Sequence, residues 1–430
     1  MKYIICALLN FTILCYGQTP YTSYFTGDVA DVTTNTQYGV CLMGGATEDN
    51  NAMMWFLNKS GGGDIVVLRA TGTNGYNSYL YSGVGVTVNS VETIVINSLA
   101  GANDSYVRQQ IRNAEAVFIA GGNQFDYITY WKNTAVDSAL NYLINTKLCP
   151  IGGTSAGMAI QGQAYFSAAV SSITSATALS DPYNSTVTMG NNDFLHHPLL
   201  NKVITDTHFD NPDRKGRLSV FLARLFQDSS QSYFGIACDE YTAVCIDELG
   251  IARVFGGFPT YDDNAYFIQA NCTLPNNPEN CSVGQPLTWN RNGAALKVYQ
   301  IKGDVSANNS FNLNDWMTCS GGSWQNWSVN SGVISYSLNT SAPNCLTTGI
   351  NQRENQEGSF LTPNPVTSTL YIGLEGVSKK IIIYNALGEI IFEDLASHEF
   401  DFTNYTDGMY YVKIETDGKI SKVEKIIVKH

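Results

Sequence analysis

The sequence predicts an α/β fold, in which a parallel sheet is covered on both faces, followed by a small all-β module. Three observations lead to this prediction. Between residues 38 and 255, short apolar runs alternate with helix-like segments, and glycines follow several of those runs. Beyond residue 350, only short β-rich runs and turn signals remain. A chain of 430 residues with 44% hydrophobic composition is long enough for two or three domains.

The predicted strands of the first region are continuous apolar runs, the pattern of strands that are buried on both faces. Strands are expected at 40–43, 65–68, 92–96, 116–120, 148–151, 202–206 and 235–238, and helices at 51–59, 106–113, 124–132 and 135–146. Sites in such sheets form beyond the carboxyl ends of the strands. The glycines at 44–45, 121–122 and 153–157 fall at those ends, so we expect one shared crevice there.

The two ends of the chain differ from its middle. Lys2 and the apolar stretch 4–15 are typical of a signal peptide, with cleavage expected after Gly17. Residues 18–350 form the predicted main domain, 351–360 a polar linker and 361–430 the β-module. In that module, strands are expected at 370–374, 380–384, 390–392, 409–415 and 419–428. No later run of 18 apolar residues occurs, so we expect no membrane span.

Charge and cysteine content exclude some partners and cofactors. The formal net charge of −13 argues against nucleic acid and anionic membrane surfaces as partners. Of ten cysteines, Cys6 and Cys15 lie in the signal peptide, which leaves eight. Loop positions predict the bridges Cys272–Cys281 and Cys319–Cys345, and apolar surroundings predict buried free thiols at Cys41, Cys149, Cys238 and Cys245. No Cys-x-x-Cys pair occurs, and we expect neither a metal nor another cofactor.

Residues 153–157 read Gly-Thr-Ser-Ala-Gly, the Gly-x-Ser-x-Gly pattern of a nucleophile elbow. At such a strand-to-helix turn, Ser155 would meet the positive end of a helix, which favours developing negative charge. The chain has 38 glycines, so a glycine-rich turn with a bystander serine is the alternative interpretation.

A nucleophilic serine needs a base, and histidine is the usual one near neutral pH. His208 follows the predicted strand 202–206 and should emerge at the same edge of the sheet as the serine. His196 and His197 stand in a loop-like stretch before a proline and are weaker candidates. The alternative for His208 is a hydrogen-bonded histidine at the rim.

The base in turn needs a carboxylate to hold its tautomer. Residues 156–180 contain no acid, so the carboxylate must come from elsewhere. Glu240, at the end of the strand 235–238, is our choice, with Asp239 next and Asp206 as a further option. The oxyanion donors expected are the backbone N–H of Ala156 and one from Gly122 or Asn123.

Four motifs in order resemble the cyanophycinase and aspartyl dipeptidase (peptidase E) family. They are 120–124 (Ala-Gly-Gly-Asn-Gln), 153–157, 206–209 (Asp-Thr-His-Phe) with 216–218, and 235–242. Residues 253–255 and 287–299 look like the longer, cyanophycinase-type branch, and the likeness covers about 38–345. It implies a flavodoxin-like three-layer α/β/α sandwich, akin to class I glutamine amidotransferase domains with serine in place of cysteine. It also implies hydrolysis of peptide bonds beside aspartate, with a β-aspartyl-arginine dipeptide as the product of cyanophycinases.

By matching position, the resemblance implies that Ser155 is the nucleophile, His208 the base and Glu240 the acid. It also implies a substrate-binding group and a substrate that is a peptide or a cyanophycin-like polymer. That group comprises Gln124, Asp206, Thr207, Arg214 and Arg217. The chain departs from the family at Thr207, where glutamine is common, and at Pro212, where a basic residue is common.

Residues 361–430 resemble a type IX secretion sorting domain. The likeness lies in Thr-Pro-Asn-Pro at 362–365, the turn at 384–388 and the ending at 408–412 through 428–430. It implies the type IX machinery as a partner and export across the outer membrane of a Bacteroidetes-type bacterium, to the medium or the cell surface. A β-rich adhesion or carbohydrate-binding appendage is the alternative.

Two other functions fit the same sequence. The crevice could hold a peptide or amino acid in a catalytically silent binding protein, or the chain could be a surface-anchored structural module. Labelling by a serine-directed reagent separates the enzyme from the binder. The oligomeric state is left open, with a homodimer among the options.

Overall fold

The computed structural model describes residues 19–345, 361–362, 365–372, 379–386, 388–394, 399–416 and 419–430. The predicted signal peptide 1–17, the predicted linker 351–360 and residues 417–418 between the last two predicted strands lie outside these residues. The chain divides into two compact units, Met1–Leu346 and Thr347–His430. Among the described residues, no helix combines the length and the apolarity that crossing a bilayer requires.

A ten-stranded sheet forms the centre of the first unit. In spatial order it consists of β1 (Thr22–Gly27), β4 (Ser90–Val95), β3 (Asp64–Arg69), β5 (Ala116–Ile119), β6 (Ile151–Thr154), β2 (Gly39–Met43), β11 (Ala243–Asp247), β12 (Ile251–Phe255), β15 (Ser310–Asn312) and β16 (Cys319–Ser320). The strands from β4 to β2 run parallel. On one side of these parallel strands, β1 pairs antiparallel with β4. On the other side, β11, β12, β15 and β16 follow β2, each antiparallel to its neighbour.

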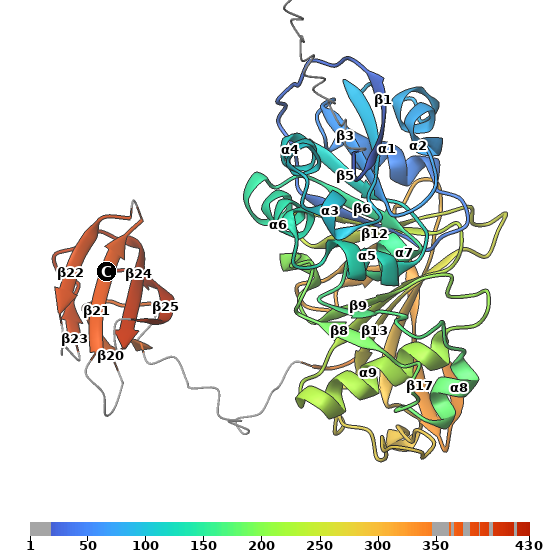
Figure 1. The fold of residues 1–430 in the computed structure, drawn as a ribbon. Coiled ribbons are helices and arrows are strands. Elements are labelled where there is room, and N and C mark those ends of the chain that lie inside the picture. The colour runs from blue at the N-terminus through green and yellow to red at the C-terminus, as the bar shows by residue number, and fades with distance from the viewer. Residues whose placement is uncertain are drawn as a thin grey trace, which may run out of the picture. The chain divides into compact units, whose positions relative to one another are not determined.

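Helices cover both faces of the parallel part, as the sequence predicts. They are α1 (Asn50–Asn58), α2 (Gly75–Ser78), α3 (Leu99–Ala102), α4 (Ser105–Asn113), α5 (Gln124–Trp131), α6 (Ala135–Tyr142) and α7 (Ala156–Ala159). Figure 1 shows α1 and α2 on one side of β3 and β5, with α4 and α6 on the other. Phe56 of α1 packs with Phe118 of β5, and Trp131 of α5 belongs to the cluster on the opposite face.

A second sheet of eight strands lies in the same unit. Its order is β18 (Val333–Thr340), β17 (Gly322–Asn330), β14 (Leu296–Lys302), β13 (Asn264–Ala270), β10 (Phe234–Cys238), β9 (Val203–Asp206), β7 (Ala164–Phe166) and β8 (Met189–Asn191). Strand β9 runs parallel to both β10 and β7, and the remaining neighbours are antiparallel.

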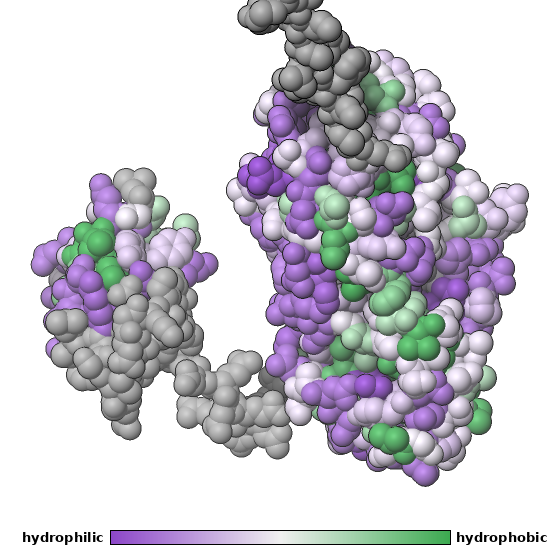
Figure 2. Space-filling model, in the orientation of Figure 1, coloured by the Kyte–Doolittle hydropathy of each residue, from purple (hydrophilic) through white to green (hydrophobic). Residues whose placement is uncertain are grey.

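The two sheets pack on each other through one apolar cluster. It joins Leu42 of β2 and Val244 of β11 to Ile236 of β10 and Phe267 of β13. The outer face of the second sheet is covered by α8 (Ser175–Ser180) and α9 (Lys215–Ser229), where Phe221 is fully buried. The second sheet therefore covers one face of β2 and β11, where the prediction had a layer of helices. The predicted α/β fold is confirmed with this addition. Exposed apolar residues lie only in small separate groups on the face drawn in Figure 2.

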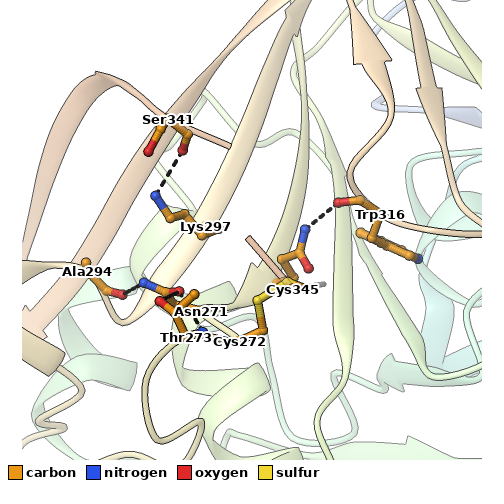
Figure 3. The surroundings of a disulfide bond; sticks show 9 residues. Asn271, Cys272, Thr273, Ala294, Lys297, Trp316, Ser341 and Cys345 are labelled. Atoms are coloured by element: carbon orange, nitrogen blue, oxygen red, sulfur yellow. Dashed lines mark hydrogen bonds between the residues drawn. A yellow bond between two sulfur atoms is a disulfide. The ribbon is translucent and has the colours of Figure 1, made fainter. Parts of the chain in front are cut away.

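The predicted disulfide pairing is wrong. One bridge joins Cys272 to Cys345 (Figure 3). Cys281 and Cys319 are free. Cys272 follows the end of β13, and Cys345 lies just beyond β18, so the bridge ties the last described segment of the unit to its second sheet. Pairing each cysteine with its neighbour in the sequence gave the wrong bridges. Cys272 and Cys345 lie close in space although strands β14 to β18 separate them along the chain.

The second unit is all-β, as predicted. One of its sheets has the order β19 (Leu361–Thr362), β20 (Thr369–Ile372) and β23 (Glu399–Asp401). The other has the order β22 (Ile390–Asp394), β21 (Lys379–Asn385), β24 (Gly408–Thr416) and β25 (Lys419–Val428). Their core includes Ile383, Phe402 and Val412.

Candidate active site

Ser155 stands at the tight turn between β6 and α7. Its backbone has φ +52° and ψ −116°, a strained conformation for a residue with a side chain. A Cβ at Gly157 would overlap the carbonyl oxygen of Ile119, and one at Gly153 would overlap that of Gly157. Both glycines are therefore required for the turn. The Ser155 N–H donates to Met43 O at 3.0 Å, which ties the turn to β2.

His208 is held by the glycine pair that follows β2. The His208 N–H donates to Gly44 O at 2.8 Å, and the residue has φ +45°. A Cβ at Gly45 would overlap the imidazole ring. Gly45 is thus required for His208 to occupy this place, and the hydrogen bond to Gly44 O links the end of β2 to the segment after β9.

The structure brings Ser155, His208 and Glu240 into one hydrogen-bonded row. The Ser155 Oγ lies 2.7 Å from His208 Nε2, and His208 Nδ1 lies 2.6 Å from Glu240 Oε1. An ionised carboxylate only accepts, so Nδ1 carries the proton and Nε2 is free to accept from the serine hydroxyl. The side chains of His208 and Glu240 are 24% and 20% exposed, which leaves this row open on one side.

The other candidate carboxylates face elsewhere. Asp239 accepts from Asn264 Nδ2 at 2.8 Å, and burial raises its pKa to about 7. Asp206 is buried and forms a two-point ion pair with Arg217, whose Nε lies 2.9 Å from Asp206 Oδ2. Of the three acids considered from the sequence, only Glu240 hydrogen-bonds His208.

A pocket of about 410 Å³ opens beside Ser155. Three groups line it: Gly122 and Asn123 with the first α5 residues Gln124 and Phe125; the loop from Ala168 to Ser172; and Ser155, Ala156, Thr207, His208, Arg214 and Arg217. Gly122, Asn123 and Ala156, whose backbone N–H groups are the expected oxyanion donors, therefore line the same pocket as Ser155. Gln124 Nε2 donates to Phe166 O at 3.4 Å.

Arg214 and Arg217 contribute differently to this pocket. The guanidinium of Arg217 is buried and engaged by Asp206. Arg214 donates to Thr207 O at 2.8 Å and has no ion pair among the described residues. Burial and the nearby Arg217 lower the pKa of Arg214 to about 10, so it remains charged at neutral pH. Arg214 is the cation that an anionic ligand would meet.

The weaker histidine candidates lie away from this row. His197 is buried against Tyr38, with its Nδ1 at 3.0 Å from the tyrosine hydroxyl, and burial lowers its pKa to about 3. His196 is exposed. Within the described part of the chain, no group of three or more His, Cys, Asp or Glu side chains is arranged to hold a metal ion.

Two family models match this chain. Residues 79–253 match the model of Peptidase family S51, and residues 361–429 match that of the Secretion system C-terminal sorting domain. The sequence resemblance is confirmed. The first match includes Ser155, His208 and Glu240 but ends before β13, so β13, β14, β17 and β18 of the second sheet lie outside it.

Two curated relatives are cyanophycinases. The chain is 28% identical over 166 residues to the cyanophycinase of Trichormus variabilis and 27% identical over 166 residues to that of a Nostoc species. Each match covers 39% of this chain and 50% of the relative, so the chain spans about half the length of the curated relatives that it matches.

Two solved structures are also similar. A peptidase from an acI-B1 actinobacterium has 11% identity and a TM-score of 0.38, over 54% of this chain and 91% of that one. A peptidase E protein from Listeria monocytogenes has 16% identity and a TM-score of 0.32, over 52% of this chain and 98% of that one.

Some contacts of the site were not predicted from the sequence. Asp210 Oδ1 accepts from the Glu240 N–H at 2.9 Å and so fixes the turn that carries Glu240. The loop from Ala168 to Ser172 forms one wall of the pocket. Asp210 stands two residues after His208 in the sequence, and this spacing could have predicted that it lies near the site. The loop has no motif or periodicity that would have placed it.

Proposed function

We propose that this chain is an exported serine peptidase that cleaves aspartyl or β-aspartyl peptide bonds through an acyl-enzyme. The observation that carries the proposal is the row Ser155–His208–Glu240 at the mouth of a pocket lined by Arg214, which has no ion pair among the described residues. The Peptidase family S51 match and the cyanophycinase relatives support the same activity.

The geometry suits transfer of an acyl group to Ser155. As Oγ attacks the carbonyl carbon, its proton passes to His208 Nε2, and Glu240 stabilises the imidazolium through Nδ1–H. The negative charge on the carbonyl oxygen develops beside the backbone N–H groups of Ala156 and of Gly122 or Asn123. His208 then protonates the leaving amine, and a water molecule, deprotonated by the same Nε2, releases the acid.

The preference for aspartyl substrates follows from Arg214. A β-linked aspartyl residue has a free α-carboxylate, and an α-linked one has a free side-chain carboxylate. Either substrate therefore places an anion close to the scissile carbonyl, where a charged guanidinium can bind it in a two-point contact. Arg217 is committed to Asp206, so its role is to support the pocket wall rather than to bind substrate.

The C-terminal unit supports export through a type IX secretion system. Residues 361–429 match a secretion sorting domain, which fits an extracellular or cell-surface location. A secreted peptidase of this kind would act on peptides or aspartate-rich polymers outside the cell.

A substrate panel tests the proposal. Cyanophycin, β-Asp-Arg, β-Asp-Lys and α-aspartyl dipeptides are compared with matched substrates in which the free carboxylate is an amide. We expect turnover of at least one acidic substrate, its loss in Ser155→Ala, and poor turnover of the amide analogues. Specific binding without turnover of any substrate would instead indicate a binding protein.

A further inference from the structure

A row of polar side chains, buried except for the half-buried Gln300, crosses the second sheet and ends beside the catalytic acid. Trp327 Nε1 donates to Gln325 Oε1 at 2.8 Å, and Gln325 Nε2 donates to Gln300 Oε1. Gln300 Nε2 donates to Asn264 Oδ1 at 2.6 Å, and Asn264 Nδ2 donates to Asp239 Oδ2 at 2.8 Å. We call these five residues the amide chain. It runs from β17 through β14 and β13 to the end of β10.

The direction of the amide chain is set by its two ends. An indole N–H can only donate, so Gln325 must turn its carbonyl toward Trp327 and its NH₂ toward Gln300. The same constraint passes through Gln300 to Asn264, whose NH₂ must then face Asp239. The carboxylate of Asp239 accepts this hydrogen bond, so nowhere along the row do two donors or two acceptors face each other. Head-to-tail amides in a buried site polarise one another, which strengthens each hydrogen bond.

The last residue of the amide chain precedes the catalytic acid. Asn264 holds Asp239 at two points, since the Asp239 N–H also donates to Asn264 O at 2.9 Å. The backbone N–H of the next residue, Glu240, donates to Asp210 Oδ1. The short turn from β10 to β11 is therefore anchored both at Asp239 and at Glu240. Asp239 is only 2% exposed, so solvent does not substitute for a lost partner.

We propose that the amide chain is a positioning device for Glu240, so that the second sheet fixes the carboxylate that orients His208. Asp239, Asn264 and Gln300 are positioning residues in this proposal and touch neither the substrate nor His208. The proposal depends on the proposed function, because it assigns Glu240 the role of catalytic acid. It also gives β13, β14 and β17, which lie outside the peptidase family match, a part in catalysis.

The test breaks the amide chain in its middle, away from the pocket. Gln300→Met removes the donor to Asn264 and the acceptor for Gln325 with little change in side-chain volume. The matched control is Gln269→Met, because Gln269 is a glutamine of the neighbouring strand β13, more buried than Gln300, and donates to Trp316 O outside the row. Both full-length variants are assayed for kcat, KM and the rate at which a fluorophosphonate labels Ser155.

We expect Gln300→Met to lower kcat and the labelling rate about tenfold, the equivalent of one ordinary hydrogen bond, with KM nearly unchanged. Gln269→Met should keep the wild-type values. In a Glu240→Gln background, Gln300→Met should lower the labelling rate no further, because the carboxylate that it positions is gone. If Gln300→Met does not fold, Gln325→Met breaks the same row one residue further from the site.

The possible failures are distinguishable. If the wild type is labelled at Ser155 and the chain-breaking variant is labelled equally fast, the amide chain is not a positioning device and the proposed function stands. The amide chain also loses this role if Gln300→Met and Gln269→Met lower kcat alike, or if the Glu240→Gln background leaves the tenfold loss intact. If the wild type is neither labelled nor active, the proposed function fails and this inference fails with it.

Discussion

The buried pair of Arg217 and Asp206 gives the sharpest prediction on stability. Both side chains are almost fully buried, at 4% and 3% exposure, and the guanidinium contacts both carboxylate oxygens. The change Arg217→Met keeps most of the apolar volume and removes the charge. The Asp206 carboxylate would then be left in the interior with the Thr207 N–H as its remaining hydrogen-bond donor.

Removing one partner of a buried ion pair costs about 3–5 kcal/mol, because the remaining charge loses its compensation. We therefore expect Arg217→Met to lower the free energy of unfolding by that amount. In the double variant Arg217→Met with Asp206→Leu, neither charge remains, and most of the loss should be recovered. The unsatisfied Thr207 N–H should then account for about 1–3 kcal/mol.

Urea unfolding followed by tryptophan fluorescence measures this loss cleanly. All six tryptophans lie between residues 55 and 327, so the signal reports on the first unit alone. A loss below about 1 kcal/mol in Arg217→Met, the range of exposed ion pairs, would refute the reasoning. It would mean that Arg217 is free to bind substrate, as the family resemblance implies.

Three further predictions follow from the site and the bridge. Arg214→Gln should raise KM for acidic substrates at least tenfold, leave the amide analogues unaffected and keep the urea midpoint; an equal effect on both substrate types would contradict the role of Arg214. Because burial raises the pKa of Asp239 from 3.8 to about 7, the folded chain keeps a proton that the unfolded chain releases between those values. Stability should therefore fall as the pH rises through that window, by up to about 4 kcal/mol, and Asp239→Asn should lack this slope in urea titrations at pH 4 and pH 8. Reduction of the Cys272–Cys345 bridge, which closes a separation of 73 residues, should lower stability by about 4 kcal/mol. Non-reducing peptide mapping that finds Cys272 joined to Cys281 would contradict the pairing.

Local signals predicted the parts of the site that are built locally. The Gly-x-Ser-x-Gly spacing specifies a tight turn because only glycine fits at 153 and 157. The prediction placed the polar residues after β9 and β10 near Ser155 on the assumption that the ends of parallel strands share one edge of a single sheet. In the structure, β9 and β10 belong to the second sheet, whereas β6, which leads to Ser155, belongs to the first. The sequence therefore indicated the three residues Ser155, His208 and Glu240, but the packing of the two sheets that brings them together was not predicted.

Contacts between distant segments were not accessible in the same way. In the second sheet, β14 pairs with β13 and β17. Nothing in the composition of these strands predicts which of them pair. The bridge Cys272–Cys345 depends on that pairing, so sequence proximity gave the wrong partners. The buried ion pair of Asp206 and Arg217 was also not predicted, because charge alone does not reveal which two side chains pair.

Covalent modification of Ser155 tests the central claim most directly. The full chain is treated with a fluorophosphonate and its peptides are analysed by mass spectrometry, with Ser155→Ala and His208→Ala as controls. The row of hydrogen bonds predicts a single adduct on Ser155, with turnover lost in step with labelling and labelling strongly slowed in His208→Ala. Full hydrolysis of an aspartyl substrate by Ser155→Ala would contradict the account, whatever the reagent modified.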